Sequence, residues 1–151
     1  MENEDSLTSE VIAILKSKLG DRIDQYAIPP PVFRAMAGQF VAVDLEAGTL
    51  IARFPVRESY LNPYGSMQGG MIAAALDNTL GPLSMLVAPP NVTRRLEITY
   101  SRPAKLDMGR ILVDARMVER QGRWLFFRAD VRSGDGLRLA RSKATHWIVD
   151  E

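Results

Sequence analysis

The chain has 151 residues, of which 46% are hydrophobic and 25% charged, with a formal net charge of +1. These values are typical of one ordinary folded domain that is long enough to bury a core. The absence of cysteine excludes disulfides, thiolate metal ligands and thiol nucleophiles. The acidic start, residues 1–5, lacks the basic region of a signal peptide, and no uninterrupted apolar run reaches the roughly 18 residues of a membrane span. We therefore expect a cytoplasmic protein without a membrane partner.

Charge is distributed unevenly along the chain. Residues 1–90 hold six Lys and Arg against ten Asp and Glu, whereas residues 91–151 hold thirteen against eight. The arginines of the second half could bind phosphates through their planar guanidinium groups. The alternative is that these arginines alternate along the strands of a sheet and lie on its solvated outer face. For each single position we favour this alternative. No basic cluster with interleaved aromatic residues is present, so nucleic acid is not an expected partner.

The N-terminal segment, residues 1–37, has a helical pattern followed by a stiff connector. Apolar residues recur at helical spacing after Thr8 or Ser9, either of which could cap a first helix that stops at Gly20. Three prolines at 29–31 then form the connector, and a short helical turn over 32–37 leads into the main domain. We place that domain at residues 38–151.

The main domain begins with a predicted hairpin and a long helix. Residues 39–45 and 49–56 are predicted to be two strands, and a loop over 57–64 follows them. The helix is predicted to cover residues 68–87, with Pro82 expected to bend or shorten its end.

The rest of the chain is predicted to be strands with period-two alternation. The four segments are 93–101, 110–120, 124–132 and 137–149. Gly-containing turns between the later segments indicate an antiparallel meander. One apolar helix between a hairpin and a meander indicates an α+β fold, with five or six strands wrapped around the helix.

The predicted long helix contains one carboxylate in an apolar run. Residues 71–76 and Leu80 would make the helix apolar on nearly every side, which predicts a buried helix. Burying an ionised carboxylate costs several kcal/mol unless it is paired, so Asp77 is expected to have a chemical use. Gly69 and Gly70 would leave the first helix amides bare, as a site for a developing negative charge. Together these features suggest acyl chemistry.

Two groups of residues, taken together, resemble a known family. Around the helix start the order is Asn62-x-x-Gly65-x-x-Gln68-Gly69-Gly70 and then Asp77. Later in the chain follow Thr93, residues 98–105, Gly122-Arg123 and residues 139–148. Over roughly residues 38–149 this resembles the hotdog-fold acyl-CoA thioesterases of the phenylacetate-pathway (PaaI-like) type, in the 4-hydroxybenzoyl-CoA thioesterase superfamily. The resemblance implies a hotdog fold and hydrolysis of an acyl-CoA thioester to a carboxylic acid and CoA, with neither metal nor cofactor.

The resemblance also implies a role for each matched residue. Asp77 would be the nucleophile or the general base that activates water. The Gly69 amide would polarise the thioester carbonyl, Asn62 would help to hold the attacking water, and a hydroxyl at Thr93 would assist near the carboxylate. These roles agree with general chemistry, because thioester hydrolysis passes through an oxyanion that preorganised N–H donors stabilise.

Gln68 departs from the family pattern, which usually has histidine at this place. Glutamine cannot carry a proton charge near neutral pH, which argues against the hydratase and dehydratase branches of the fold. The only histidine is His146, on the last predicted strand, where we expect it to be structural and half exposed.

Spacing predicts that the site is shared between subunits. Gly69 and Asp77 are eight residues apart, or about 12 Å along a helix axis, which is too far for both to touch one thioester carbon. We therefore expect a homodimer, and a homotetramer is possible in this family. Arg94, Arg95 and Arg102 are candidates for binding the CoA phosphates.

Each candidate residue also has a structural interpretation. Asp77 could be satisfied by backbone amides or an arginine, Gly69 and Gly70 could permit close packing, Asn62 could shape its loop, and Thr93 could be an ordinary strand residue. The alternative function is a non-catalytic acyl-CoA or lipid-binding hotdog protein. A third possibility is an interaction module that uses the N-terminal helix.

Overall fold

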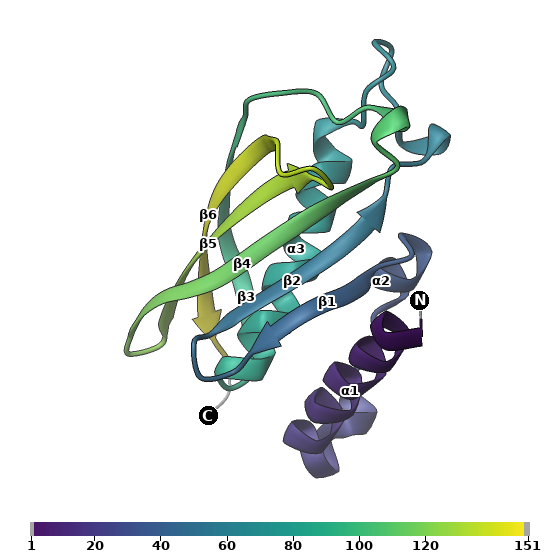
Figure 1. Cartoon of the computed structure of the whole chain (residues 1–151). Coiled ribbons are helices and arrows are strands. Elements are labelled where there is room, and N and C mark those ends of the chain that lie inside the picture. The colour runs from purple at the N-terminus through teal and green to yellow at the C-terminus, as the bar shows by residue number, and fades with distance from the viewer. Residues whose placement is uncertain (1, 150–151) are drawn as a thin grey trace.

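The computed structural model describes residues 2–149 and is a six-stranded antiparallel sheet curved around one long helix (Figure 1). The helices are α1 (Glu2–Leu19), α2 (Pro31–Ala35) and α3 (Gly69–Val87), with short 3-10 turns η1 (Gly20–Gln25), η2 (Glu58–Tyr60) and η3 (Leu106–Met108). The strands are β1 (Gln39–Asp44), β2 (Thr49–Pro55), β3 (Asn91–Tyr100), β4 (Arg110–Gln121), β5 (Trp124–Ser133) and β6 (Arg138–Ile148). Every predicted strand and the long helix are present, so the predicted α+β layout is confirmed.

The order of the strands differs in one respect from a simple meander. The strands lie in the order β1-β2-β4-β5-β6-β3, and all neighbours are antiparallel. A meander over residues 93–149 would place β3 beside β4, whereas β3 pairs with β6 and β4 pairs with β2. The physical reason is that α3 carries the chain across the concave face to the far edge of the sheet, and residues 101–109 then return to its centre (Figure 1). As a result β3 is an edge strand.

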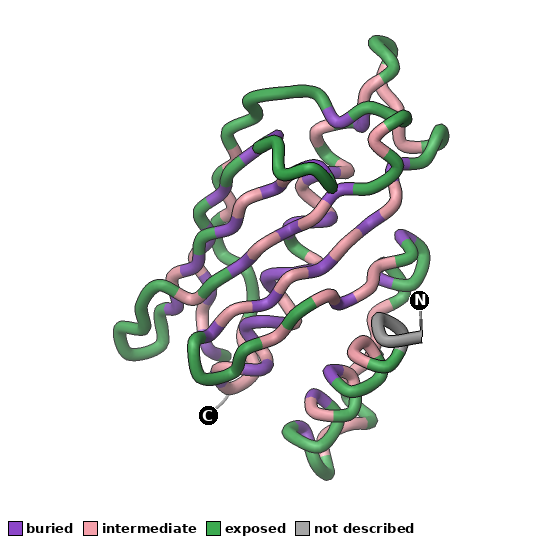
Figure 2. The backbone as a smooth tube through the Cα atoms, viewed as in Figure 1, coloured by how far each residue is buried: buried purple, intermediate pink, exposed green. Residues whose placement is uncertain are grey.

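The core lies between α3 and the concave face of the sheet. Alternate residues of β2, such as Leu50, Ala52 and Phe54, are fully buried, and the same alternation runs along β5 (Figure 2). The covered side of α3 carries Ile72, Ala75, Leu76, Thr79, Leu80, Leu83, Ser84 and Leu86. Each fully buried leucine side chain contributes about 1.5–3 kcal/mol relative to exposure, so this face fixes the position of the helix.

The opposite side of α3 is not covered by the described residues of this chain. Asp77 and Gly70 are exposed there, and Ala73 and Ala74 are only partly buried. The prediction of a helix buried on all sides, with a buried Asp77, is therefore wrong for a single chain, because the sheet wraps one side only. By length and composition α3 could cross a membrane, but mostly buried core helices of globular proteins share this length and composition.

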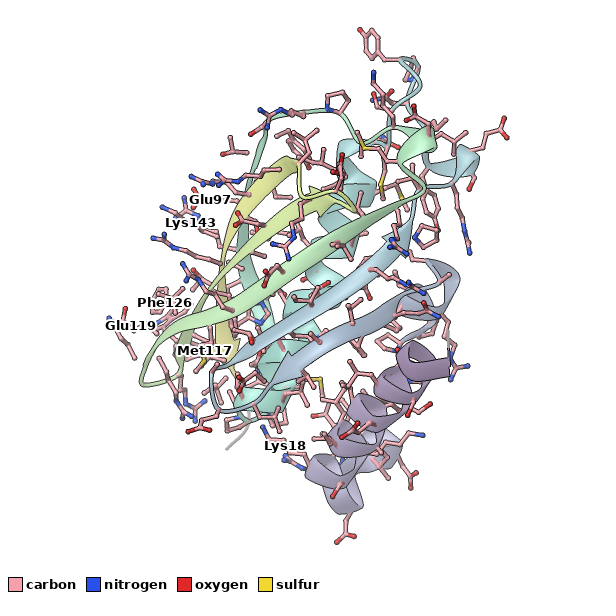
Figure 3. All side chains as sticks on the ribbon, viewed as in Figure 1. Lys18, Glu97, Met117, Glu119, Phe126 and Lys143 are labelled. Carbon is pink, nitrogen blue, oxygen red and sulfur yellow. The ribbon has the colours of Figure 1, made fainter. Side chains whose placement is uncertain are left out.

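The charged side chains of the second half lie mostly on the outer face of the sheet. Arg116, Arg128 and Lys143 are exposed, while their strand neighbours Ala115 and Ala129 are buried. In the β3–β6 ladder Glu97 lies opposite Lys143, and both project from this outer face (Figure 3). The interpretation of the alternating arginines as a solvated sheet face is confirmed for these positions.

The first helix begins earlier than its sequence signals suggest. α1 starts at Glu2, so Thr8 and Ser9 lie inside the helix, and the prediction that either caps it is wrong. The hydroxyl of Thr8 instead accepts a hydrogen bond of 2.9 Å from the amide of Phe40 in β1. Val11 and Leu15 are buried in the same core as the sheet. The division of the chain at residues 1–37 and 38–151 stays a prediction.

Lys18 joins α1 to the end of α3 (Figure 3). Its Nζ donates hydrogen bonds to the carbonyls of Met85 (2.8 Å) and Ala88 (2.9 Å). A cation at this place is favourable because the last carbonyls of a helix lack partners and carry partial negative charge. The helix reaches Val87 without stopping at Pro82, so the expected shortening is wrong.

Replacing Lys18 tests how firmly α1 is fixed to the core. Lys18→Ala removes two hydrogen bonds to helix carbonyls and should lower the free energy of unfolding by about 1 kcal/mol. Urea denaturation followed by circular dichroism measures this. Lys16→Ala is the matched control, since Lys16 is an exposed lysine of the same helix. Equal losses in the two variants would contradict this role of Lys18.

Candidate active site

The first half of the site is the pair of Asp77 and Thr93. Asp77 lies on the uncovered side of α3, and its Oδ1 accepts a hydrogen bond of 2.9 Å from Thr93 Oγ1 on β3. Because the carboxylate is exposed, it remains hydrated and needs no buried counter-charge in the isolated chain. The hydroxyl holds one oxygen of this exposed carboxylate. The two residues that the sequence placed together in one site are thus in contact.

A buried histidine lies directly behind this pair. His146 is 1% exposed, so the expectation that it is half exposed is wrong. It lies opposite Thr93 in the β3–β6 ladder, with Nε2 3.4 Å from Thr93 Oγ1 and Nδ1 2.8 Å from Asn91 Oδ1. Its ring also packs on Phe127, with the ring centroids 4.8 Å apart. Burial lowers the pKa of His146 below its ordinary value, and the charge of Asp77 opposes this with a smaller effect.

Neither His146 nor Asn91 was among the predicted site residues. The available signal was the period-two pattern of the last strand. Ser142, Ala144, His146 and Ile148 share one face of β6 and are all buried. Strand alternation therefore points His146 inward, whereas its polar character alone suggests an exposed position.

The second half of the site is the start of α3. Gln68 is the N-cap residue, and its carbonyl accepts hydrogen bonds from the amides of Met71 and Ile72. The amides of Gly69 and Gly70 have no backbone acceptor within residues 2–149. Two free N–H groups at the positive end of a helix are a ready site for an oxyanion. The exposed Gln68 side chain makes no capping hydrogen bond that would cover them.

Tyr100 packs on this helix start and was missed as a site residue. Its hydroxyl donates a hydrogen bond of 2.7 Å to the carbonyl of Gly69. A Cβ at Gly69 would lie 3.2 Å from the Tyr100 ring, while one at Gly70 would meet nothing within 4 Å. Close packing therefore explains one of the two glycines. Burial raises the pKa of Tyr100, so the phenol stays protonated and remains a donor.

Asn62 shapes the loop that precedes α3. Its Oδ1 accepts hydrogen bonds from the amides of Tyr64 (2.9 Å) and Ser66 (3.1 Å). The interpretation that Asn62 shapes its loop is therefore confirmed. The Nδ2 group of Asn62 is the part of the side chain that could contact water. A role for Asn62 in holding the attacking water stays a prediction.

The two halves of the site lie apart on one chain. Asp77 and Gly69 are at separate turns of α3, and the arginines divide in the same way. Arg94 and Arg95 are next to Thr93, whereas Arg102 follows Tyr100, about 25 Å further along an extended strand. Arg95 forms an exposed ion pair with Glu97, and Arg102 donates to the carbonyl of Arg138. The three arginines therefore do not converge within one chain.

Metal ligands are not part of this arrangement. Within residues 2–149 no group of three or more histidine, aspartate or glutamate side chains could hold a metal ion. The chemistry of the described side chains rests on a carboxylate, a hydroxyl and helix amides. A sheet wrapped around one helix, with these groups on the uncovered side, defines the class of hotdog-fold thioester hydrolases.

Comparisons with known proteins agree with this class. The family model described as "Thioesterase superfamily" matches residues 64–140. Acyl-coenzyme A thioesterase 13 of Homo sapiens is 33% identical over 97 residues, which cover 63% of this chain and 68% of that protein. The chain belongs to the thioesterase superfamily, and the family predicted from its sequence is confirmed.

Two solved structures support the fold assignment. A phenylacetic acid degradation-related protein from Ralstonia eutropha JMP134 matches with a TM-score of 0.76 and 29% identity, covering 89% of this chain and 98% of that chain. A protein from Streptococcus mutans UA159, solved with bound acetyl-CoA, matches with a TM-score of 0.67 and 26% identity, covering 74% and 90% of the two chains. The predicted hotdog fold is confirmed.

Substitutions at the two glycines test the packing at the helix start. Gly69→Ala forces the Tyr100 ring away from the Gly69 carbonyl and should lower the free energy of unfolding by about 1 kcal/mol relative to Gly70→Ala. Gly70→Ala meets no neighbour and gains helix propensity, so it should be neutral or slightly stabilising. Thermal unfolding of both variants measures the difference, and identical midpoints would contradict the close contact.

Proposed function

We propose that the protein hydrolyses acyl-CoA thioesters to carboxylic acids and free CoA. The observation that carries the proposal is the exposed Asp77 carboxylate, held through one oxygen by Thr93 beside an uncovered helix. The 33% identity to a human acyl-coenzyme A thioesterase and the likeness to a structure with bound acetyl-CoA support the choice of CoA thioesters.

In the proposed reaction Asp77 acts as general base. Thr93 occupies Oδ1, and Oδ2 takes the proton of a water molecule as the water attacks the thioester carbonyl. The negative charge that develops on the carbonyl oxygen is stabilised by the free amide of Gly69 at the helix start. The collapse of the tetrahedral intermediate expels the CoA thiolate. Asn62 contributes its Nδ2 group to the orientation of water.

We infer that each site is completed by a second copy of the chain. The eight residues between Gly69 and Asp77 separate them by about 12 Å along α3, so one chain cannot present both to one carbonyl. Asp77 is exposed on the side of α3 that the sheet leaves open, and Gly69 is partly buried at the start of the helix. The adjacent β3 is a ten-residue edge strand, and long unpaired edges favour pairing with another chain. A two-fold arrangement of α3 and β3 brings Asp77 of one copy to Gly69 of the other.

The same arrangement accounts for the positions of the arginines. Arg94 and Arg95 lie beside the Asp77 half, and Arg102 lies beside the Gly69 half. When the two halves come from different copies, Arg102 of one chain joins the partner's Arg94 and the partner's Arg95 at one site. All three are exposed, and a guanidinium group can bind phosphate through two parallel N–H donors once Arg95 is released from Glu97 and Arg102 from the Arg138 carbonyl.

Gln68 is compatible with this mechanism. The oxyanion donors are backbone amides, and their position depends on the start of α3 rather than on the side chain of the N-cap residue. The alternative, a non-catalytic acyl-CoA or lipid-binding protein, follows if glutamine here removes activity. Measuring the turnover of acyl-CoA distinguishes a thioesterase from a binding protein.

Purified protein should release free thiol from some members of a panel of short, long and aromatic acyl-CoAs. The absence of cysteine means that the protein itself contributes no signal to a thiol-detection assay. Asp77→Asn should lower kcat by roughly 10²–10⁴-fold, the range for loss of a general base. Asp21→Asn, at an exposed aspartate on η1, is the matched control and should keep wild-type activity. Binding of acyl-CoA without turnover across the whole panel would contradict the proposal.

A further inference from the structure

Behind Asp77 lies a series of linked hydrogen bonds that has no part in the proposed reaction. The Asn91 Nδ2 group donates to the carbonyl of Pro89 at 2.9 Å. Asn91 Oδ1 lies 2.8 Å from His146 Nδ1, and His146 Nε2 lies 3.4 Å from Thr93 Oγ1. Thr93 then donates to Asp77 at 2.9 Å. This series of hydrogen bonds runs from the end of the α3–β3 connection through the buried His146 ring to the exposed Asp77 carboxylate.

The contacts of Asn91 determine which ring nitrogen of His146 carries the proton. A carbonyl can only accept, so the Asn91 group that faces Pro89 is the NH₂ group and the group that faces His146 is the oxygen. That oxygen also only accepts, so Nδ1 of His146 must carry a hydrogen. In the neutral ring Nε2 is then an acceptor, and it faces the hydroxyl of Thr93. Burial, which disfavours the imidazolium form, acts in the same direction.

Thr93 therefore has one hydroxyl proton and two acceptors. While Asp77 is ionised, the shorter contact of 2.9 Å directs the proton to the carboxylate. Once Oδ2 of Asp77 has taken a proton from water, Oδ1 is a neutral carbonyl oxygen and a weaker acceptor than the ionised carboxylate, so the Thr93 hydroxyl turns to its other acceptor. His146 Nε2, at 3.4 Å, is placed to receive it.

We propose that His146 is a positioning residue that gives the Thr93 hydroxyl its second acceptor, so that this hydroxyl reverses direction when Asp77 is protonated. No proton moves to the histidine. The water O–H bond breaks, the new O–H bond forms on Asp77, and Thr93 only rotates about its C–O bond. The inference rests on the proposed function, with Asp77 as general base. It also gives the only histidine of the chain a role that does not require contact with substrate.

Steady-state kinetics on the acyl-CoA substrates test this role. His146→Phe should lower kcat about tenfold and leave KM unchanged, because the lost hydrogen bond forms only after the proton moves. His146→Gln should stay within about threefold of wild type, since its amide oxygen can accept from Thr93. In a Thr93→Val background, His146→Phe should have no further effect. Equal losses in the Phe and Gln variants, or the same loss with and without Thr93, would overturn the inference.

Nitrogen NMR of the single histidine gives a readout that does not depend on turnover. With ¹⁵N-labelled histidine at pH 8, Nδ1 should be protonated and Nε2 unprotonated. Asp77→Ala removes the first acceptor of Thr93, so the Nε2 signal should move toward its hydrogen-bonded position, and Thr93→Val should abolish that movement. An Nε2-protonated ring, or an Nε2 signal that does not respond to Asp77→Ala, would overturn the inference even if hydrolysis is observed. Absence of hydrolysis with the expected NMR result would overturn the proposed function alone.

Discussion

The arrangement of the site depends on the pairing of β3 with β6 at the far edge of the sheet. This pairing places β3 along the open side of α3, where Thr93 reaches Asp77 and Tyr100 reaches the carbonyl of Gly69. The register sets Thr93 directly opposite His146, so the buried ring lies behind the hydroxyl that holds the carboxylate. A shift of one residue would turn Thr93 to the other face of the sheet and separate all these groups. One strand therefore positions both halves of the site.

The two halves use different physical means to reach the same end, which is preorganisation. At Asp77 a side-chain hydroxyl, with a buried imidazole behind it, holds one carboxylate oxygen in place. At Gly69 the free amides are fixed by the helix itself, and the Tyr100 contact holds the start of that helix. In the proposed mechanism neither half uses the side chain of residue 68, which is glutamine. The single histidine acts instead from the last strand, behind the carboxylate and away from the carbonyl site.

Periodicity predicted the local structure well, and long-range contacts account for what it missed. The alternation of residues 110–149 predicted β4, β5 and β6, and the apolar run predicted α3 within a residue of its start. An all-round apolar helix, however, can be covered by its own sheet or by another chain, and the pattern does not distinguish these, so the exposure of Asp77 was missed. The hydroxyl of Thr8 is suited to capping a helix, but in the structure it accepts a hydrogen bond from β1. Asp77 and Gly69 were predicted from the residues themselves as well as from a family resemblance, and Thr93 came from the resemblance alone. Tyr100 and Asn91 emerge only from packing, and strand alternation indicates the burial of His146 but not its contact with Thr93.

The central claim, that each site combines two copies of the chain, is tested most directly by mixing two inactive variants. Asp77→Asn removes the base, and Gly69→Pro removes the amide hydrogen at the first helical position, where proline is tolerated. Gly69→Ala, which adds a Cβ but keeps the N–H, controls for the contact with Tyr100. Random pairing of equal amounts after co-expression gives about half mixed dimers with one intact site each, so about a quarter of wild-type activity should return. Activity no higher than that of either variant alone would contradict the claim.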